Sequence, residues 1–419
     1  MILVERRLGN VSLLGELQSL AESAGYCVVE TLEQVRAPDS RYQIGKGKLE
    51  ELARLVRETN AQRVIFENEL KPVQAYNIAK ATGVEVIDKF QLILEVFSRN
   101  ASTREAKLQI ELARLRYELT QAKEKVRLAK KGEQPGFHGL GRYEVDVYFE
   151  AIKRRVASIE AQLLRLRRMK QVKRTLRSDL GLQTISLAGY TVAGKSTLFK
   201  ALTSVPAKVD RGPFTTLSPK TSTIDFHGKK ALLTDTVGFI DRIPITLIEA
   251  FKSTLDETVF SDLIVLVVDV SENISEIERK LRCCLKTLRE IGVCTTPIIT
   301  AFNKVDLVDS TTLDKTLEEL KGLAPNPVPI SALYSINLEK LKRMIFEKLK
   351  GFVKASFRLP LNSSSLSLIS KIHTLSSVVS QLYGEKSVTI TVESAGLVID
   401  KIKNHIENAG GQVLETQQV

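Results

Sequence analysis

The sequence predicts an α/β protein with several parts: a small parallel α/β domain, a long antiparallel helical hairpin, a larger parallel α/β domain and a small α+β domain. With 419 residues, the chain is too long for one ordinary hydrophobic core. Short apolar runs alternate with amphipathic stretches in two separate regions, as in parallel sheets covered by helices. Between these regions, apolar residues recur at alternating spacings of four and three, the heptad pattern of paired helices. We place the four parts at residues 1–103, 104–177, 178–352 and 353–419.

The first part alternates strands with helices. The expected strands are apolar runs at residues 2–4, 27–29, 64–66 and 84–87. The expected helices lie between them, at residues 13–23, 48–58 and 72–81. Pro72 suits the first turn of the last helix, and Gly83 suits its end. This alternation predicts a small parallel sheet with helices on both faces.

The second part consists of two heptad segments joined by a loop rich in glycine and proline, at residues 132–141. The first segment carries its apolar seam on Leu108, Leu112 and Leu115, and the second carries it on Ile152 and Ile159. We therefore expect an antiparallel hairpin of two helices, each roughly 40 Å long at about 1.5 Å per residue.

The positive charge of the chain is concentrated in this hairpin. The whole chain has 61 Lys+Arg and 49 Asp+Glu, a net charge of +12. Residues 104–177 alone hold 20 basic and 9 acidic residues. A charged helix is usually just a solvated face, but an ordinary coiled coil balances its charges. The imbalance favours nucleic-acid contact, and the candidate RNA-binding residues are Lys153, Arg154, Arg155, Arg165, Arg167 and Arg168.

The composition excludes several other classes of protein. Hydrophobic residues make up 43% and charged residues 26%, which is typical of a globular chain. The longest apolar run, residues 263–268, is far shorter than the roughly 20 residues of a membrane span, so no membrane partner is expected. The first residues do not have the pattern of a signal peptide. The four cysteines and four histidines show no disulfide or zinc spacing, so we expect a cytoplasmic protein.

A phosphate-binding loop opens the third part. A strand-like run at residues 184–188 leads into GYTVAGKS at residues 189–196, and a helix follows. This is the GxxxxGK[ST] pattern in the strand–loop–helix context that it requires. Its glycines let the backbone wrap the phosphates, Lys195 reaches the β- and γ-oxygens, and Ser196 ligates Mg²⁺. The loop residues expected to bind the nucleotide are Gly189, Tyr190, Thr191, Val192, Ala193, Gly194, Lys195, Ser196 and Thr197.

Three further motifs follow in order, each after a predicted strand. The first is a DxxG turn, whose carboxylate reaches Mg²⁺ through water and whose glycine amide reaches the γ-phosphate. The second is an NKxD sequence, whose carboxylate accepts two hydrogen bonds from guanine, a pairing that adenine cannot offer. The third is a turn whose backbone amide can contact guanine O6. Together they predict a Ras-like G domain that binds GTP and GDP, with contacts from Asp235, Thr236, Val237, Gly238, Asn303, Lys304, Val305, Asp306, Ser331, Ala332 and Leu333.

Between the phosphate loop and the DxxG turn lies GPFTTLSP at residues 212–219, which contains two adjacent threonines. One of them is expected to ligate Mg²⁺ and to become ordered with the γ-phosphate. Thr216 is our choice and Thr215 the fallback, while a threonine-rich surface turn is the alternative. The nucleotide contacts expected here are Phe214, Thr215, Thr216, Leu217 and Ser218. The catalytic set is then Lys195, Thr216 and Gly238, and the Mg²⁺ ligands are Ser196, Thr216 and, through water, Asp235.

Phe239 stands directly after the DxxG glycine. Many small GTPases use a glutamine at that position to orient the attacking water. A phenyl ring cannot do so, whether or not it is simply a packed core residue. We therefore expect slow intrinsic hydrolysis, with the water positioned by backbone or by a partner.

The last part, residues 353–419, carries no chemical motif that we can name. A helix is expected at residues 366–383, an alternating strand at 388–392 and a second helix at 398–408. These elements predict a small α+β domain.

The chain resembles the HflX family of ribosome-associated GTPases. The residues that carry the resemblance are IGKGKLEEL at 44–52, VIFENEL at 64–70, VIDKFQLILE at 86–95, AKLQIELARLRY at 106–117 and DTVGFI at 235–240. The hairpin loop, GEQPGFHGLGR at 132–142, lacks the GPGE-type motif of the commoner bacterial members and is more similar to the archaeal branch. The resemblance covers residues 1–350 strongly and the remainder weakly.

This resemblance implies that the protein binds the large ribosomal subunit and its rRNA, that the subunit stimulates its GTPase, and that it splits or rescues ribosomes. We expect a monomer when the protein is off the ribosome. Some members also hydrolyse ATP, but the motif at residues 303–306 favours GTP. Two alternatives remain open: a nucleotide-regulated RNA-binding or chaperone protein, and a GTPase whose hairpin binds a protein.

Overall fold

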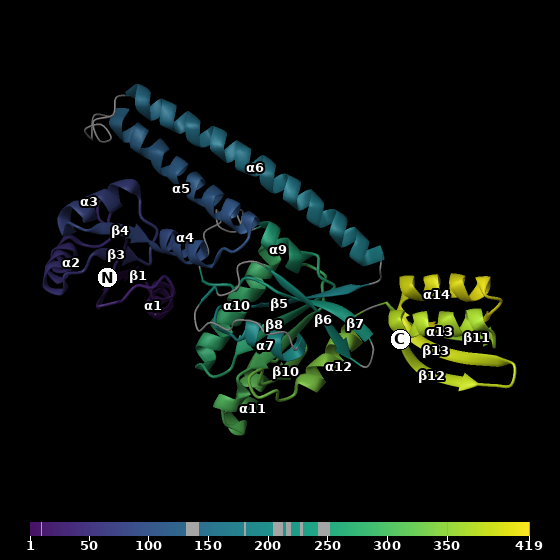
Figure 1. Cartoon of the computed structure of the whole chain (residues 1–419). Coiled ribbons are helices and arrows are strands. Elements are labelled where there is room, and N and C mark those ends of the chain that lie inside the picture. The colour runs from purple at the N-terminus through teal and green to yellow at the C-terminus, as the bar shows by residue number, and fades with distance from the viewer. Residues whose placement is uncertain are drawn as a thin grey trace. The chain divides into compact units, whose positions relative to one another are not determined.

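The computed structural model describes residues 1–9, 11–130, 142–179, 182–203, 213–214, 219–226, 229–241, 252–349 and 351–418 (Figure 1). Its internal contacts divide the chain into two compact units. The N-terminal unit is Met1–Leu166 with Asp210–Ser218 and Arg242–Lys252, and the C-terminal unit is Arg167–Val209, Pro219–Asp241 and Ser253–Val419. The fold class is confirmed, because the described residues form two sheets of mainly parallel strands, a helical hairpin and an antiparallel sheet.

The first sheet has four parallel strands in the order β2-β1-β3-β4. Its strands are β1 Ile2–Arg7, β2 Glu30–Val35, β3 Arg63–Phe66 and β4 Glu85–Asp88, and its helices are α1 Leu14–Ser23, α2 Lys46–Thr59, α3 Pro72–Thr82 and α4 Lys89–Asn100. Consecutive residues Leu3 and Val4 are both buried, as expected for a strand with helices on both faces. The strand expected at residues 27–29 is wrong, since the second strand begins at Glu30.

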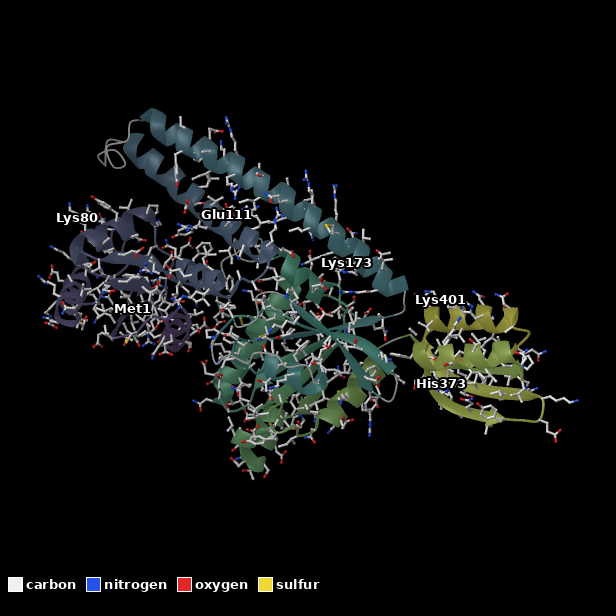
Figure 2. The ribbon with its side chains drawn as sticks, viewed as in Figure 1. Met1, Lys80, Glu111, Lys173, His373 and Lys401 are labelled. Atoms are coloured by element: carbon white, nitrogen blue, oxygen red, sulfur yellow. The ribbon has the colours of Figure 1, made fainter. Side chains whose placement is uncertain are left out.

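The hairpin consists of α5 Arg104–Lys130 and α6 Arg142–Asp179. Its seam is the predicted one: Leu108 and Leu112 of α5 pack against Ile159 of α6. Two ion pairs join the helices, Arg116 to Glu160 at 2.8 Å and Arg155 to Glu111 at 2.7 Å, and Figure 2 labels Glu111 on α5. The loop at residues 131–141 lies outside the described residues.

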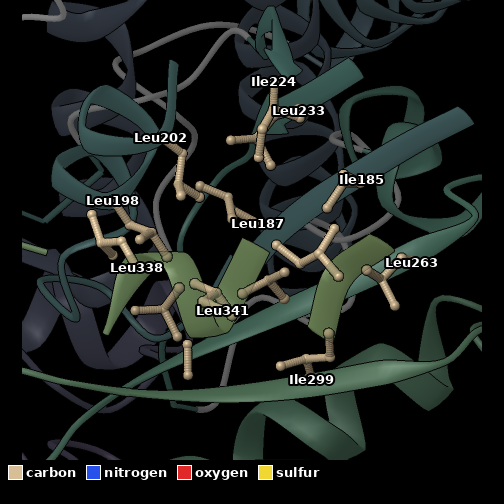
Figure 3. Packing of buried hydrophobic residues seen from close by; sticks show 14 of the residues in the cluster. Ile185, Leu187, Leu198, Leu202, Ile224, Leu233, Leu263, Ile299, Leu338 and Leu341 are labelled. Carbon is tan, nitrogen blue, oxygen red and sulfur yellow. The ribbon is translucent and has the colours of Figure 1, made fainter. Parts of the chain in front are cut away.

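The second sheet has six strands in the order β10-β9-β8-β5-β7-β6, all parallel except β6, which runs antiparallel to β7. Its strands are β5 Gln183–Gly189, β6 Lys220–Phe226, β7 Lys229–Asp235, β8 Leu263–Asp269, β9 Ile298–Asn303 and β10 Pro327–Pro329. Its helices are α7 Lys195–Thr203, α9 Lys252–Val259, α10 Ile274–Glu290, the 3₁₀ turn η2 Val305–Leu307, α11 Ser310–Leu320 and α12 Leu338–Lys348. Figure 3 shows part of the core, in which Leu187 and Leu233 of the sheet lie in one cluster with Leu341 of α12.

The C-terminal part is a βαββαβ unit with an antiparallel sheet in the order β12-β13-β11-β14. Its elements are β11 Phe352–Pro360, α13 Ser363–Leu375, β12 Ser377–Tyr383, β13 Ser387–Ala395, α14 Gly396–Asn408 and β14 Gln412–Gln418. Both helices lie on one face of the sheet (Figure 1). The helix expected to reach residue 383 is wrong in its second half, because residues 377–383 pair with β13 as an edge strand. In the part of the chain that the structure describes, no helix is long and apolar enough to cross a membrane.

Candidate nucleotide-binding site

The phosphate loop joins the end of β5 to the start of α7. Gly189 and Gly194 both have positive φ, 145° and 95°. A Cβ atom on Gly189 would lie 2.3 Å from the carbonyl oxygen of Val267, and one on Gly194 would lie 2.3 Å from Nδ2 of Asn303. Glycine is therefore favoured at both positions, because the backbone has positive φ and lies against β8 at Gly189 and against the Asn303 side chain at Gly194.

Lys195 is buried at the base of this loop. Its Nζ donates to the carbonyl oxygens of Gly189 at 3.1 Å and Tyr190 at 2.7 Å. Burial lowers the pKa of the ammonium, and the carboxylate of Asp235 opposes that shift. The ammonium is thus held by backbone in the place where the pattern expects phosphate oxygens.

Ser196 and Asp235 bring a hydroxyl and a carboxylate together. The Oγ of Ser196 donates to Oδ2 of Asp235 at 2.8 Å. These are the hard oxygen ligands that Mg²⁺ prefers, and Mg²⁺ is commonly bound by one or two protein ligands together with waters and phosphates. Among the described residues, no cluster of three or more His, Cys, Asp or Glu side chains suited to a metal is found. The pair fits Mg²⁺; the third expected ligand, Thr216, lies outside the described residues.

The DxxG turn lies directly against the phosphate loop. A Cβ atom on Gly238 would lie 2.9 Å from both Nζ of Lys195 and Cγ2 of Thr191. Next to it, the backbone of Phe239 donates to Gly189 O at 3.0 Å and accepts from Thr191 N at 2.8 Å. Phe239 is only 2% exposed, so its ring is a packed core residue and offers no polar group for a water.

The NKxD sequence follows β9. Asn303 does not face outward: its Nδ2 donates to Ala193 O at 2.9 Å, and its Oδ1 accepts from Ala332 N at 2.9 Å. It therefore ties the phosphate loop to the turn at residues 331–333, a role that the sequence reasoning missed. The carboxylate of Asp306, by contrast, is exposed and open to a base.

The remaining residues that were expected to contact the nucleotide do not all lie at one site. Val192, at the tip of the phosphate loop, has φ 64° and is 54% exposed. Phe214 packs within the N-terminal unit: its ring meets that of Phe97 edge-on at 4.6 Å, and Asn100 Nδ2 donates to its carbonyl oxygen at 3.0 Å. Residues 215–218 lie outside the described residues. The first turn of α7 holds Thr197, and the DxxG turn holds Thr236 and Val237. The 3₁₀ turn η2 begins at Val305.

Two contacts near the site were also missed. The hydroxyl of Tyr190 accepts from Asp241 N at 3.0 Å, which adds a third tie between the phosphate loop and the residues after the DxxG turn. Asp269, at the end of β8, forms an ion pair with Lys304. A signal for Asp269 was present, because a carboxylate directly after a buried apolar strand lies at the sheet edge where ligands bind.

The six candidate RNA-binding residues differ in how much of their charge is engaged. Arg155 pairs with Glu111 at 2.7 Å, Arg167 with Asp256 at 2.8 Å, and Lys153 with Glu150 at 2.7 Å. The other three, Arg154, Arg165 and Arg168, are exposed along α6. All six side chains are thus exposed, and three of them form ion pairs with nearby carboxylates.

Three family models match the chain. One described as "GTP-binding GTPase N-terminal" covers residues 12–98, one described as "GTP-binding GTPase Middle Region" covers 100–177, and one described as "50S ribosome-binding GTPase" covers 184–304.

Several relatives and one solved structure are similar to the chain. The GTPase HflX of Thermofilum pendens is 46% identical over 352 residues, covering 84% of this chain and 83% of the relative. That of Methanocaldococcus jannaschii is 48% identical, covering 80% and 82%, and that of Thermococcus kodakarensis is 38% identical, covering 96% and 94%. A GTP-binding protein from Sulfolobus solfataricus in complex with GDP is similar at 30% identity and a TM-score of 0.45, over 83% of this chain and 99% of that chain.

Proposed function

Since the chain belongs to the HflX family and is a GTP hydrolase, we propose that it binds the large ribosomal subunit and uses the GTP cycle to control that association, in ribosome splitting or rescue. The observation that carries this proposal is the row of exposed arginines on α6, the helix that leads directly into the G domain. We also propose that the protein is located in the cytoplasm and is a monomer when it is off the ribosome.

In this proposal each motif of the G domain has a definite role. Lys195 and the loop amides hold the β- and γ-phosphates, and the Gly238 amide reaches the γ-phosphate. Asp306 accepts from guanine N1 and N2. Asn303 keeps the base site and the phosphate site at a fixed spacing through its two backbone hydrogen bonds.

Ser196 and Thr216 would hold Mg²⁺ directly, and Asp235 would hold it through water. When bound, the ion supplies charge neutralisation on the phosphate oxygens. The hydroxyl–carboxylate hydrogen bond between Ser196 and Asp235 keeps both side chains in place for that role.

Hydrolysis is expected to be slow on the protein alone. Phe239 is buried and joined by its backbone to the phosphate loop, so its side chain cannot orient a water. In this proposal, the ribosomal subunit supplies the missing positioning group and thereby stimulates hydrolysis.

Arg154, Arg165 and Arg168 are the residues that we propose contact rRNA phosphates. Arginine contacts to phosphate release counterions, so binding that depends on them weakens steeply with salt. The triple charge reversal of Arg154, Arg165 and Arg168 to Glu should lower large-subunit affinity and reduce the slope of log K against log salt by roughly 2–3.

The test measures GTP hydrolysis with and without purified large subunits at two salt concentrations, and subunit binding by co-sedimentation. Strong stimulation that fades with salt and is lost in the triple variant supports the proposal. The matched control reverses Lys371, Lys386 and Lys403, three exposed residues of the C-terminal part. An equal loss of subunit binding in both variants contradicts the proposal, and so does stimulation that does not depend on salt concentration.

A second candidate, a GTPase whose hairpin binds a protein, is supported by one observation. Met169, Val172 and Leu176 recur along one face of α6 and are 61%, 62% and 57% exposed. An apolar helix interface would resist salt, so the same salt series separates this function from RNA binding.

A further inference from the structure

Asp269 lies where the sheet brings two site-forming loops together. It is the last residue of β8, after a run of buried apolar residues, and its side chain is 12% exposed. In the parallel register of β8 and β9, Asp269 is the partner of Asn303. Lys304 follows Asn303 in the chain, so its backbone lies close to Asp269.

The two oxygens of Asp269 have separate tasks. Oδ1 accepts from the amide of Ser271 at 3.0 Å and from its hydroxyl at 2.6 Å. These two bonds fix the orientation of the carboxylate. Oδ2 is left directed at Nζ of Lys304, with which it forms an ion pair.

Lys304 is thus held at both ends. Its backbone has φ 68°, an unusual conformation for a lysine, and its carbonyl oxygen accepts from Leu307 N at 3.0 Å. Its ammonium is held by Asp269. Only the methylene stem between these anchors remains to form a surface, and the side chain keeps 28% of its area exposed.

We propose that Asp269 is a positioning residue for the purine base: by holding the Lys304 ammonium, it keeps the methylene stem as one fixed wall of the base site. This rests on the assignment of residues 303–306 as the guanine site. A wall of methylene groups contacts any purine face, whereas the Asp306 carboxylate recognises only bases that offer the right N–H groups. The two residues therefore predict different effects on base selectivity.

The experiment measures the affinity of the full chain for GDP and for IDP by calorimetry. Asp269→Asn keeps an oxygen for Ser271 but loses the charge that holds Lys304. We expect both affinities to fall about tenfold, which is about 1.4 kcal/mol. The ratio of the GDP affinity to the IDP affinity (the GDP/IDP ratio) should stay unchanged. In hydrolysis, the KM for GTP should rise by a similar factor while kcat falls less than twofold.

Two further variants keep the test sharp. Ser271→Ala retains the charge but loosens the carboxylate, so it should weaken both nucleotides about threefold. In a Lys304→Met background, whose apolar stem needs no anchor, Asp269→Asn should add no further loss, because the coupling has been removed.

Several outcomes would overturn the proposal: unchanged GDP affinity in Asp269→Asn, a changed GDP/IDP ratio, or an undiminished effect in the Lys304→Met background. Asp306→Asn is the control for the site itself and should lower the GDP/IDP ratio. If Asp306→Asn leaves that ratio unchanged, the guanine site is misassigned. If it lowers the ratio and Asp269→Asn has no effect, only the positioning role fails.

Discussion

The two sheets of mainly parallel strands use the polar residues at their carboxyl ends in opposite ways. In the N-terminal sheet, these residues are bonded to one another and to nearby backbone. In the G-domain sheet, they lead into loops whose backbone and side chains face a ligand site. Parallel sheets bind ligands at this edge, yet only one of the two carries a phosphate loop. The comparison shows that function follows from how the strand ends satisfy their polar atoms, and not from the architecture.

In the N-terminal sheet, polar side chains near the carboxyl ends of the strands bond to one another and to backbone. Lys89, after β4, bonds to Glu16 at 2.7 Å and lies 3.8 Å from Glu67, which follows β3. Asn68 bonds through its side chain to both backbone atoms of Arg6, at 2.8 and 2.9 Å. This edge of the sheet is therefore closed by its own side chains.

The buried lysines Lys89 and Lys195 give the sharpest form of this comparison. Lys89 is paired with carboxylates, whereas Lys195 bonds to backbone carbonyls and lies near one carboxylate. We therefore expect the first to stabilise the fold and the second to bind phosphate.

The largest effect is expected for Lys89→Met, at about 3–5 kcal/mol of lost unfolding free energy, because the variant leaves buried carboxylates without their cation. Urea unfolding of the full chain measures it, and GDP affinity should be unchanged. Lys80→Met, an exposed lysine labelled in Figure 2, is the control and should change stability by less than about 0.5 kcal/mol. Loss of GDP binding in Lys89→Met without loss of stability would reverse the assignment.

Lys195→Ala should weaken GTP binding by about a hundredfold, roughly 2.7 kcal/mol, because it removes the charge on the β- and γ-phosphates. Its folding stability should not fall, since burial disfavours the charged form. Calorimetry measures the first quantity and thermal unfolding the second. Lys200→Ala, on the exposed face of α7, is the matched control. Nucleotide affinity that survives in Lys195→Ala would contradict the phosphate role.

A pH dependence of GDP binding should follow from the same lysine. Because burial lowers the pKa of Lys195 from 10.5, the nucleotide-free protein loses this proton at a lower pH than an exposed lysine does. Bound phosphates favour the charged form, so GDP affinity should fall as the pH rises, beginning below pH 10.5. Binding measured across alkaline pH should show the fall in the native chain and lack this component in Lys195→Ala.

The smallest effect is expected at the tip of the phosphate loop. Val192 is β-branched and has φ 64°, a conformation that glycine adopts without strain. Val192→Gly should therefore stabilise the protein by about 0.5–1 kcal/mol, measured by thermal unfolding without nucleotide. Val192→Ala keeps a Cβ atom and should gain less. Destabilisation in both variants would show that the side chain makes contacts worth more than the strain.

The G domain was predictable because its motifs depend on local order. A phosphate loop, a DxxG turn and an NKxD sequence each follow a strand, and parallel strands bring their carboxyl ends to one edge. The links between these loops were not predictable. The bonds of Asn303 to Ala193 and Ala332 depend on the spatial neighbours of β9, which no spacing in the sequence reveals.

The errors in secondary structure have a similar cause. Residues 377–383 continue an apolar pattern that fits a helix, but they pair with β13, and tertiary pairing overrides local pattern. Residues 27–29 are apolar, yet the paired strand is the more polar β2, whose register against β1 places Leu32 in the core. Pattern alone identifies buried segments more reliably than it identifies edge strands.

The contact of Phe214 with Phe97 and Asn100 has a consequence for the order of synthesis. Phe97 is made early, with the rest of its sheet, whereas Phe214 is added only after the hairpin and the phosphate loop. At about 5–20 residues per second, the interval is on the order of ten seconds. The N-terminal unit therefore cannot complete its packing when only Met1–Leu166 has left the ribosome. Its remaining segments, Asp210–Ser218 and Arg242–Lys252, are made later, as parts of the G-domain sequence.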